Sequence, residues 1–136
     1  MVTFTITYQG DLRCSAVHGP SKTILLTDAP VDNHGRGESF SPTDLIATGL
    51  ATCVVTTIGI VAKRDAVGFT GATAEVEKHM TTDLPRRIAR LVVHVAMPLG
   101  LPAAVRAKLE RAGHTCPVKL SLHPDVIVEL AYRYAD

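Results

Sequence analysis

Alternation of hydrophobic and polar residues predicts β-strands in the first and last parts of the chain. Residues 2–8 (VTFTITY) alternate with β-branched and aromatic side chains, as a strand should. Turn sequences at Gly10-Asp11 and at His18-Gly19-Pro20 then predict an N-terminal antiparallel meander. The further strands are expected at residues 12–17, 23–27, 71–80, 88–97 and 125–134.

A long uncharged stretch in the middle of the chain predicts the main helix. Ser41 can cap it, Pro42 suits the first helical position, and Asp44 completes a pattern like a capping box. The helix should end at Lys63-Arg64, since cations suit the negative C-terminal end of a helix.

Two shorter helical segments are expected in the second half of the chain. One covers residues 102–112 and stops at Gly113, and the other runs from Cys116-Pro117 to Leu120. The order is then three strands, the long helix, two strands, a helix and one strand. This order favours an α+β fold, with antiparallel sheets packed around the long central helix.

The long helix is apolar on nearly every side, which one sheet cannot cover. We therefore expect an intimate homodimer in which the long helices are buried centrally. Residues 45–62 carry no charge and reach the lower length limit of a membrane span. The four threonines and two glycines in this run, and the lack of a second span, favour a core helix instead, so no membrane association is expected.

Size and composition limit the classes of function. The 136 residues are expected to form one domain, residues 1–136. A net charge of +1, with three Phe, three Tyr and no Trp, argues against nucleic acid as a partner. The N-terminus lacks a signal-peptide pattern, and three widely spaced cysteines do not form a secreted disulfide framework. A cytoplasmic location with reduced thiols is expected.

Two of the three cysteines have settings that suggest redox chemistry. Cys53 lies in the middle of the long helix, and Cys116 precedes a proline at a helix start, whereas Cys14 lies in a strand. A reactive cysteine must be a thiolate, and Cys53 is too far from either helix end to use the dipole. It therefore needs a cation, from Arg36 in the preceding loop or from Arg13 in the second strand. Cys116 is expected to be an N-cap, where unpaired amides favour its thiolate.

Other kinds of site find little support in the sequence. His114 and Cys116 could supply two metal ligands, but no second close pair completes a tetrahedral set, so no metal site is expected. There is no P-loop, GxGxxG or GxSxG motif, so nucleotide binding and serine hydrolase chemistry are not indicated.

The blocks FSPTDLIATGLATC and, about sixty residues later, HTCPVKLSL resemble the OsmC/Ohr superfamily of organic-hydroperoxide-reducing proteins. The resemblance covers essentially the whole chain, including the predicted element order. It implies an OsmC-like fold, βββ-α-ββ-α-β, and an intertwined homodimer with two active sites at the subunit interface. It also implies that Cys53 attacks the peroxide and that Cys116 resolves the product as a disulfide.

The sequence departs from the superfamily beside the proline of the helix start. Well-characterised branches have there a Glu that pairs with the catalytic arginine, whereas this chain has Thr43. Asp44 or Glu38 could replace that acid. The arginine comes from different loops in different branches, so Arg36 is the first candidate and Arg13 the second.

The leading hypothesis is a thiol-dependent peroxidase that reduces organic hydroperoxides to alcohols. Its steps would be a Cys53 sulfenic acid, a Cys53–Cys116 disulfide and reduction by an external dithiol, with no bound cofactor. Apolar neighbours of Cys53 in the sequence would favour a hydrophobic peroxide. One alternative is a non-enzymatic binder of small apolar or acyl ligands at the dimer interface. Another is a thiol hydrolase, for which no general base near Cys53 can be assigned.

Overall fold

The structure is a computed structural model that describes residues 1–135. The chain divides into two compact units, Met1–Ile46 and a second unit from Ala47 onward. The prediction that residues 1–136 form one domain stays a prediction.

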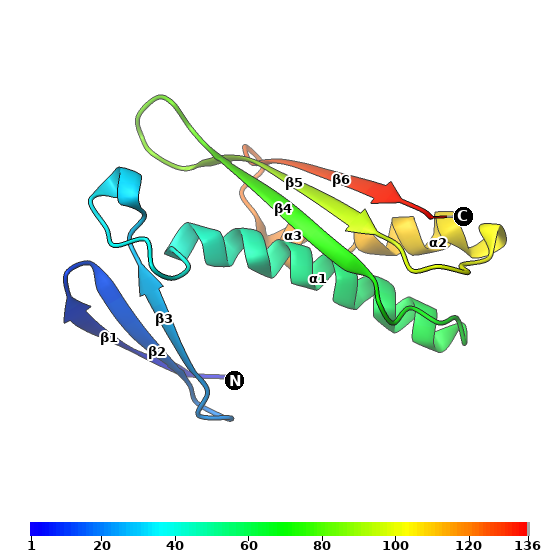
Figure 1. Ribbon diagram of the computed structural model, residues 1–136, viewed down its shortest axis with the longest axis horizontal. Helices are drawn as coiled ribbons and strands as arrows, with labels where there is room; N and C mark the ends of the chain where they lie inside the picture. Colours follow the sequence, from blue (N-terminus) through cyan, green and yellow to red (C-terminus); the bar gives the residue numbers. More distant parts are fainter. Residues whose placement is uncertain (136) are drawn as a thin grey trace. The chain divides into compact units, whose positions relative to one another are not determined.

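The N-terminal unit is a three-stranded antiparallel sheet in the order β1-β2-β3 (Figure 1). The strands are Phe4–Gly10, Arg13–His18 and Ile24–Asp28. A single 3-10 turn, Val31–Asn33, follows β3 in the loop that leads to the long helix. The predicted meander is therefore confirmed, with boundaries shifted by one or two residues.

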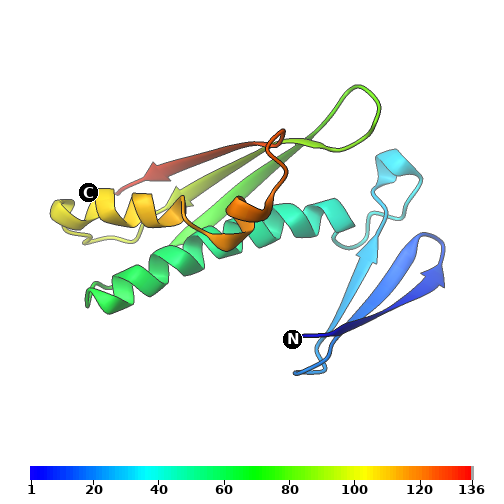
Figure 2. The same cartoon turned by 180° about the vertical axis from the view of Figure 1, so that it is seen from behind.

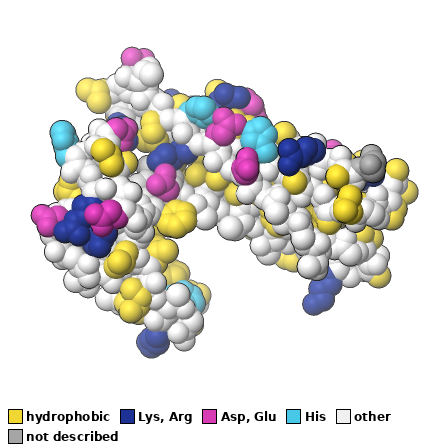
Figure 3. All heavy atoms as spheres, viewed as in Figure 1, with side chains coloured by type: hydrophobic (Ala, Val, Ile, Leu, Met, Phe, Trp, Pro, Cys, Tyr) yellow, Lys and Arg dark blue, Asp and Glu magenta, His cyan; other side chains and the backbone are white. Residues whose placement is uncertain are grey.

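This sheet has no apolar core of its own. Within residues 1–46, Asp28 and Ser41 are the buried residues, and both are polar. Phe4, Ile6 and Tyr8 alternate along β1 and are 58–63% exposed. Figure 3 shows hydrophobic side chains on the surface of this unit. A sheet with so much exposed apolar surface requires cover from another surface.

The second unit contains a mixed sheet in the order β4-β5-β6, formed by Thr73–Met80, Ile88–Ala96 and Ile127–Arg133. β4 and β5 are antiparallel, but β5 and β6 are parallel. The expectation of purely antiparallel sheets is therefore wrong at β6. The reason is the long connection between β5 and β6, which contains the helices α2 (Ala103–Gly113) and α3 (Pro117–Ser121). This connection returns the chain to the end of the sheet at which β5 begins, so β6 runs in the same direction as β5.

The long helix α1, Pro42–Arg64, supplies one side of the core of the second unit. Leu50, Val54 and Ile58 are completely buried, as are Leu91 and Val93 of β5. Both ribbon views show α1 and α2 on the same face of the sheet (Figures 1 and 2). With a mean hydropathy of 2.1 over its most apolar window, α1 is long and apolar enough to cross a membrane, a test that core helices also pass. Its contacts with the sheet are those of a core helix.

The start of α1 forms as the sequence predicts. The Asp44 backbone N–H donates to Ser41 Oγ at 3.0 Å, and the Ser41 N–H donates to Asp44 Oδ2 at 2.8 Å. These reciprocal bonds satisfy two groups that the first turn of a helix leaves unpaired. The capping box is confirmed.

The end of α2 differs from the prediction. Gly113 is the last helical residue, and it is not among the glycines with a positive φ angle. Its role is therefore not that of a left-handed stop. A Cβ atom at this position would clash with the hydroxyl of Tyr132, so the glycine is needed for close packing.

Candidate functional site

Cys53 and Cys116 come together inside the second unit. Cys53, on α1, is half-buried and packs against the core cluster that contains Cys116. Cys116 is completely buried at the N-terminus of α3, and the Cys53 thiol lies close enough to raise its pKa. Both cysteines are free thiols, as is Cys14 on β2 of the other unit. The second unit therefore contains a candidate dithiol site.

The surroundings of Cys116 favour its protonated form. As predicted, Cys116 is the N-cap of α3 with Pro117 behind it, and its sulfur accepts a bond from the Lys119 N–H at 3.3 Å. The backbone amides of Val118 and Lys119 lower the pKa of this thiol. Burial has the largest effect and raises the pKa of this thiol, and the nearby Cys53 raises it further. The helix amides favour the thiolate, as expected, but desolvation outweighs them and the pKa of Cys116 is raised.

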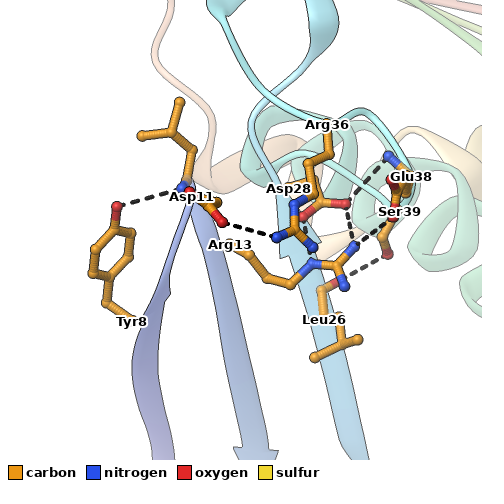
Figure 4. A network of polar contacts seen from close by, with 9 residues as sticks. Tyr8, Asp11, Arg13, Leu26, Asp28, Arg36, Glu38 and Ser39 are labelled. Atoms are coloured by element: carbon orange, nitrogen blue, oxygen red, sulfur yellow. Dashed lines mark hydrogen bonds and ion pairs between the residues drawn. The ribbon is translucent and has the colours of Figure 1, made fainter.

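The N-terminal unit contains the second feature of interest, an arginine held by two carboxylates (Figure 4). Arg13 and Asp28 face each other across β2 and β3. Arg13 donates through Nε to Asp28 Oδ1 and through Nη2 to Asp28 Oδ2, each at 2.7 Å. The same Nη2 lies 3.3 Å from Glu38 Oε2. Neither carboxylate engages Nη1, which stays available to another acceptor.

Asp28 is the carboxylate that sequence reasoning missed. The strand predicted at residues 23–27 leaves Asp28 outside it, whereas Asp28 is the last residue of β3 and has a completely buried side chain. Its Oδ2 also accepts the Glu38 N–H at 3.2 Å. Arg13 lowers the pKa of Asp28, and Asp28 in turn raises the pKa of Arg13. The available signal was an acid at the end of one strand opposite an arginine at the start of its neighbour.

Of the other predicted site residues, Glu38 contacts Arg13, whereas Arg36 and Asp44 make different contacts. Arg36 donates to Asp11 Oδ2 at 3.0 Å, and the two side chains are 42% and 80% exposed. Glu38 belongs to the Arg13 cluster but is 65% exposed. Asp44 takes part in the capping box of α1. Of the candidate acids, Asp28 is therefore the one that binds an arginine in a fixed, bidentate geometry.

A third polar cluster lies on the outer face of the mixed sheet. Glu77 accepts bonds from His94 Nε2 at 2.6 Å and His79 Nε2 at 3.2 Å. These contacts lower the pKa of Glu77, with His94 as the largest cause. Within residues 1–135, no group of three or more His, Cys, Asp or Glu side chains has a geometry that could hold a metal ion.

The geometry defines an α+β protein with a pair of adjacent free thiols on a core helix and a helix N-cap. The sequence model of the family described as OsmC-like protein matches residues 35–131. The chain belongs to this family, within the OsmC/Ohr superfamily.

Solved structures give the same result. A crystal structure from Psychrobacter arcticus 273-4, assigned as an osmotic stress induced and detoxification response protein, is 44% identical with a TM-score of 0.92. The match covers 98% of this chain and 96% of that one. An organic hydroperoxide resistance protein OsmC from Legionella pneumophila has the same fold (18% identity, TM-score 0.78, coverage 97% and 96%).

A third similar structure is an organic hydroperoxide resistance protein from Elizabethkingia anophelis (16% identity, TM-score 0.79, coverage 99% and 96%). At these identities, the second and third similarities show the fold alone. No curated protein matches the chain.

Proposed function

We propose that this protein is a thiol-dependent peroxidase that reduces organic hydroperoxides to alcohols. The observation that carries the proposal is the pair of free thiols in one core cluster, in which Cys116 is buried and both burial and the nearby Cys53 raise its pKa. Family membership supports a redox function related to peroxides.

The proposed cycle has three steps. The Cys53 thiolate attacks the distal peroxide oxygen, the O–O bond breaks, and the alcohol leaves with a proton. Cys116 then attacks the sulfur of the Cys53 sulfenic acid, which forms the disulfide and releases water. An external dithiol finally reduces the disulfide by two successive exchanges and is itself oxidised. Because Cys116 is completely buried, the reductant is expected to attack the sulfur of the more accessible Cys53.

We propose Arg13 rather than Arg36 as the cation that serves Cys53. Two carboxylates fix the orientation of Arg13 and leave Nη1 for a thiolate or a peroxide oxygen. Arg36 is more exposed, and its ion pair is with Asp11, a largely exposed aspartate. A pre-organised donor loses less conformational entropy when it binds the reacting group, which favours Arg13.

The apolar residues near Cys53 in the sequence do not support a preference for hydrophobic peroxides. Leu50, Val54 and Ile58 are completely buried in the core of the second unit and so are not available to a substrate. The proposed substrate class is supported instead by the names of two similar structures, the organic hydroperoxide resistance proteins of Legionella pneumophila and Elizabethkingia anophelis.

A second candidate function is the binding of small apolar ligands without chemistry. An open groove of about 410 Å³ runs between α1 and β4. It is lined by three threonines of α1 together with small apolar side chains, namely Thr48, Ala51, Thr52, Val55, Thr56, Ala74 and Val76. This groove is the observation that favours a binder.

We also propose a cytoplasmic homodimer. The apolar, exposed face of β1 and the exposed Ile46 (44%) and Ile60 (60%) of α1 support assembly with a second copy, because they form surfaces that water solvates poorly. The absence of a secreted disulfide framework, with all three cysteines free, supports a reducing compartment.

The test is consumption of cumene hydroperoxide with dithiothreitol as the reductant. Cys53→Ser should abolish turnover, whereas Cys14→Ser should retain it, since Cys14 lies outside the dithiol site. Arg13→Met should reduce turnover far more than Arg36→Met. Normal turnover by Cys53→Ser would reject the peroxidase proposal. If neither the wild-type protein nor Cys14→Ser consumes peroxide, the binder becomes the better description.

A further inference from the structure

Two tyrosines, Tyr132 in β6 and Tyr134 just after its end, bond to the C-terminal half of α2. Tyr132 Oη donates to the backbone carbonyl of Glu110 at 3.2 Å, and Tyr134 Oη donates to Glu110 Oε1 at 2.7 Å. The Arg106 guanidinium lies over the Tyr134 ring, 4.4 Å from its centroid. Both tyrosines bond to the same residue, but Tyr132 binds the backbone of the helix and Tyr134 binds a side chain.

The hydroxyl of Tyr132 also fills the space beside Gly113, where α2 ends. A Cβ atom on Gly113 would clash with this hydroxyl, and it would lie 3.3 Å from Ile58 Cδ1 and from Val54 Cγ1 of α1. The glycine thus lets the end of α2 approach α1 at Val54 and Ile58, on the helix that also carries Cys53. Tyr132 closes the other side of the same contact.

The chain between Gly113 and Cys116 is short and internally bonded. The Thr115 N–H and the Thr115 hydroxyl both donate to the Ala112 carbonyl, at 3.0 Å and 2.7 Å. Cys116 comes next and begins α3. The position of the Cys116 sulfur therefore depends on where α2 ends, and Tyr132 helps to fix that point.

Tyr132 is also close to the thiols electrostatically. Burial raises the pKa of Tyr132 to about 12, and the charges of Glu110 and of a Cys116 thiolate contribute to the increase. The hydroxyl therefore keeps its proton at neutral pH and remains a hydrogen-bond donor.

We propose that Tyr132 is a positioning residue for disulfide formation, because it sets the approach of Cys116 to Cys53 through Gly113 and the Glu110 carbonyl. This inference rests on the proposed peroxidase function. In the step concerned, the Cys116 sulfur bonds to the Cys53 sulfur, the S–O bond of the sulfenic acid breaks, and the hydroxyl leaves as water with the Cys116 proton. A displaced Cys116 slows this step and gives a second peroxide time to oxidise Cys53 to the sulfinic acid.

The experiment is single-turnover kinetics on the full chain with cumene hydroperoxide. Tyr132→Phe keeps the ring and removes the hydroxyl, and Tyr134→Phe is the matched control, since its hydroxyl also bonds to Glu110 but does not contact Gly113. Tyr132→Phe should leave the rate of the first, peroxide-dependent step within about twofold. It should slow disulfide formation by about five- to tenfold, the effect of one lost neutral hydrogen bond, and raise the sulfinic fraction in mass spectra. Tyr134→Phe should change neither rate.

A second variant tests the contact with Gly113. Gly113→Ala should slow disulfide formation in the same way, because the added Cβ displaces the hydroxyl. The double variant Gly113→Ala/Tyr132→Phe should be no slower than Tyr132→Phe alone, since the clashing atom is then absent and the two effects are not additive. The normal first step in each variant serves as the check that the protein is folded.

The outcomes separate the two proposals. Disulfide formation at the wild-type rate in Tyr132→Phe, an equal slowing of both steps, or an equal effect of Tyr134→Phe would overturn the role of Tyr132 and leave the peroxidase proposal intact. If the wild-type protein forms no disulfide with peroxide, the proposed function fails first, and this inference fails with it.

Discussion

Ile60 on α1 offers a quantitative test of the proposed homodimer. Its side chain is 60% exposed in one chain, although it lies on the most apolar helix of the protein. Full burial of an isoleucine contributes about 1.5–3 kcal/mol, so burying the exposed 60% of this one contributes about 1–2 kcal/mol. A twofold-symmetric dimer contains the contact twice. Ile60→Ser should therefore weaken assembly by about 2–4 kcal/mol, which raises Kd by roughly 30- to 700-fold.

Analytical ultracentrifugation over a range of protein concentrations measures this change. Serine and isoleucine have similar helix propensities, so the variant should still form α1. Leu99→Ser is the control, because Leu99 is 78% exposed but lies outside α1, and it should leave Kd unchanged. A wild-type protein that stays monomeric at all concentrations, or equal Kd values for wild type and Ile60→Ser, would refute burial of this helix face between subunits.

Three further predictions follow from the structure. Because pairing with Arg13 lowers the pKa of Asp28 below its ordinary value of 3.8, its stabilising effect is complete above that pH and is lost as the pH falls. Asp28→Asn should therefore flatten the acid side of the unfolding free energy, measured with urea between about pH 5 and 2, and an unchanged slope would contradict the pairing. Iodoacetamide at pH 8 should label Cys116 more slowly than Cys53, because Cys116 is completely buried and burial raises its pKa. Peptide mapping that finds Cys116 labelled first would contradict this prediction. Leu50→Ala should lower the unfolding free energy by about 3–5 kcal/mol, because Leu50 is completely buried. Thr52 is exposed, so Thr52→Ala should change the unfolding free energy by no more than about 0.5 kcal/mol. Similar losses for both variants would show that the core is wrongly placed.

The elements whose signal is local could be predicted from the sequence. Strand β1 alternates apolar and polar residues, and the structure forms it two residues later than expected. Ser41 and Asp44 define the start of α1 because their bonds involve residues only three positions apart. The N-cap position of Cys116 was predicted for the same reason.

Features that depend on distant contacts could not be predicted in this way. Asp28 looked like a loop residue because its partner, Arg13, is on another strand. Gly113 looked like a helix stop because the hydroxyl that excludes a side chain there comes from Tyr132, nineteen positions later. The ionisation of Cys116 depends on burial by the whole second unit, which a local comparison of helix amides omits. The parallel pairing of β6 depends on the path of α2 and α3.

The most direct test of the peroxidase mechanism is the state of the cysteines after one equivalent of organic hydroperoxide. The reduced protein is treated with cumene hydroperoxide, free thiols are blocked by rapid alkylation at acid pH, and disulfides are mapped by peptide mass spectrometry. We expect a Cys53–Cys116 disulfide within one chain, with Cys14 alkylated as a free thiol. Recovery of both Cys53 and Cys116 as alkylated free thiols, with the peroxide unconsumed, would contradict the mechanism.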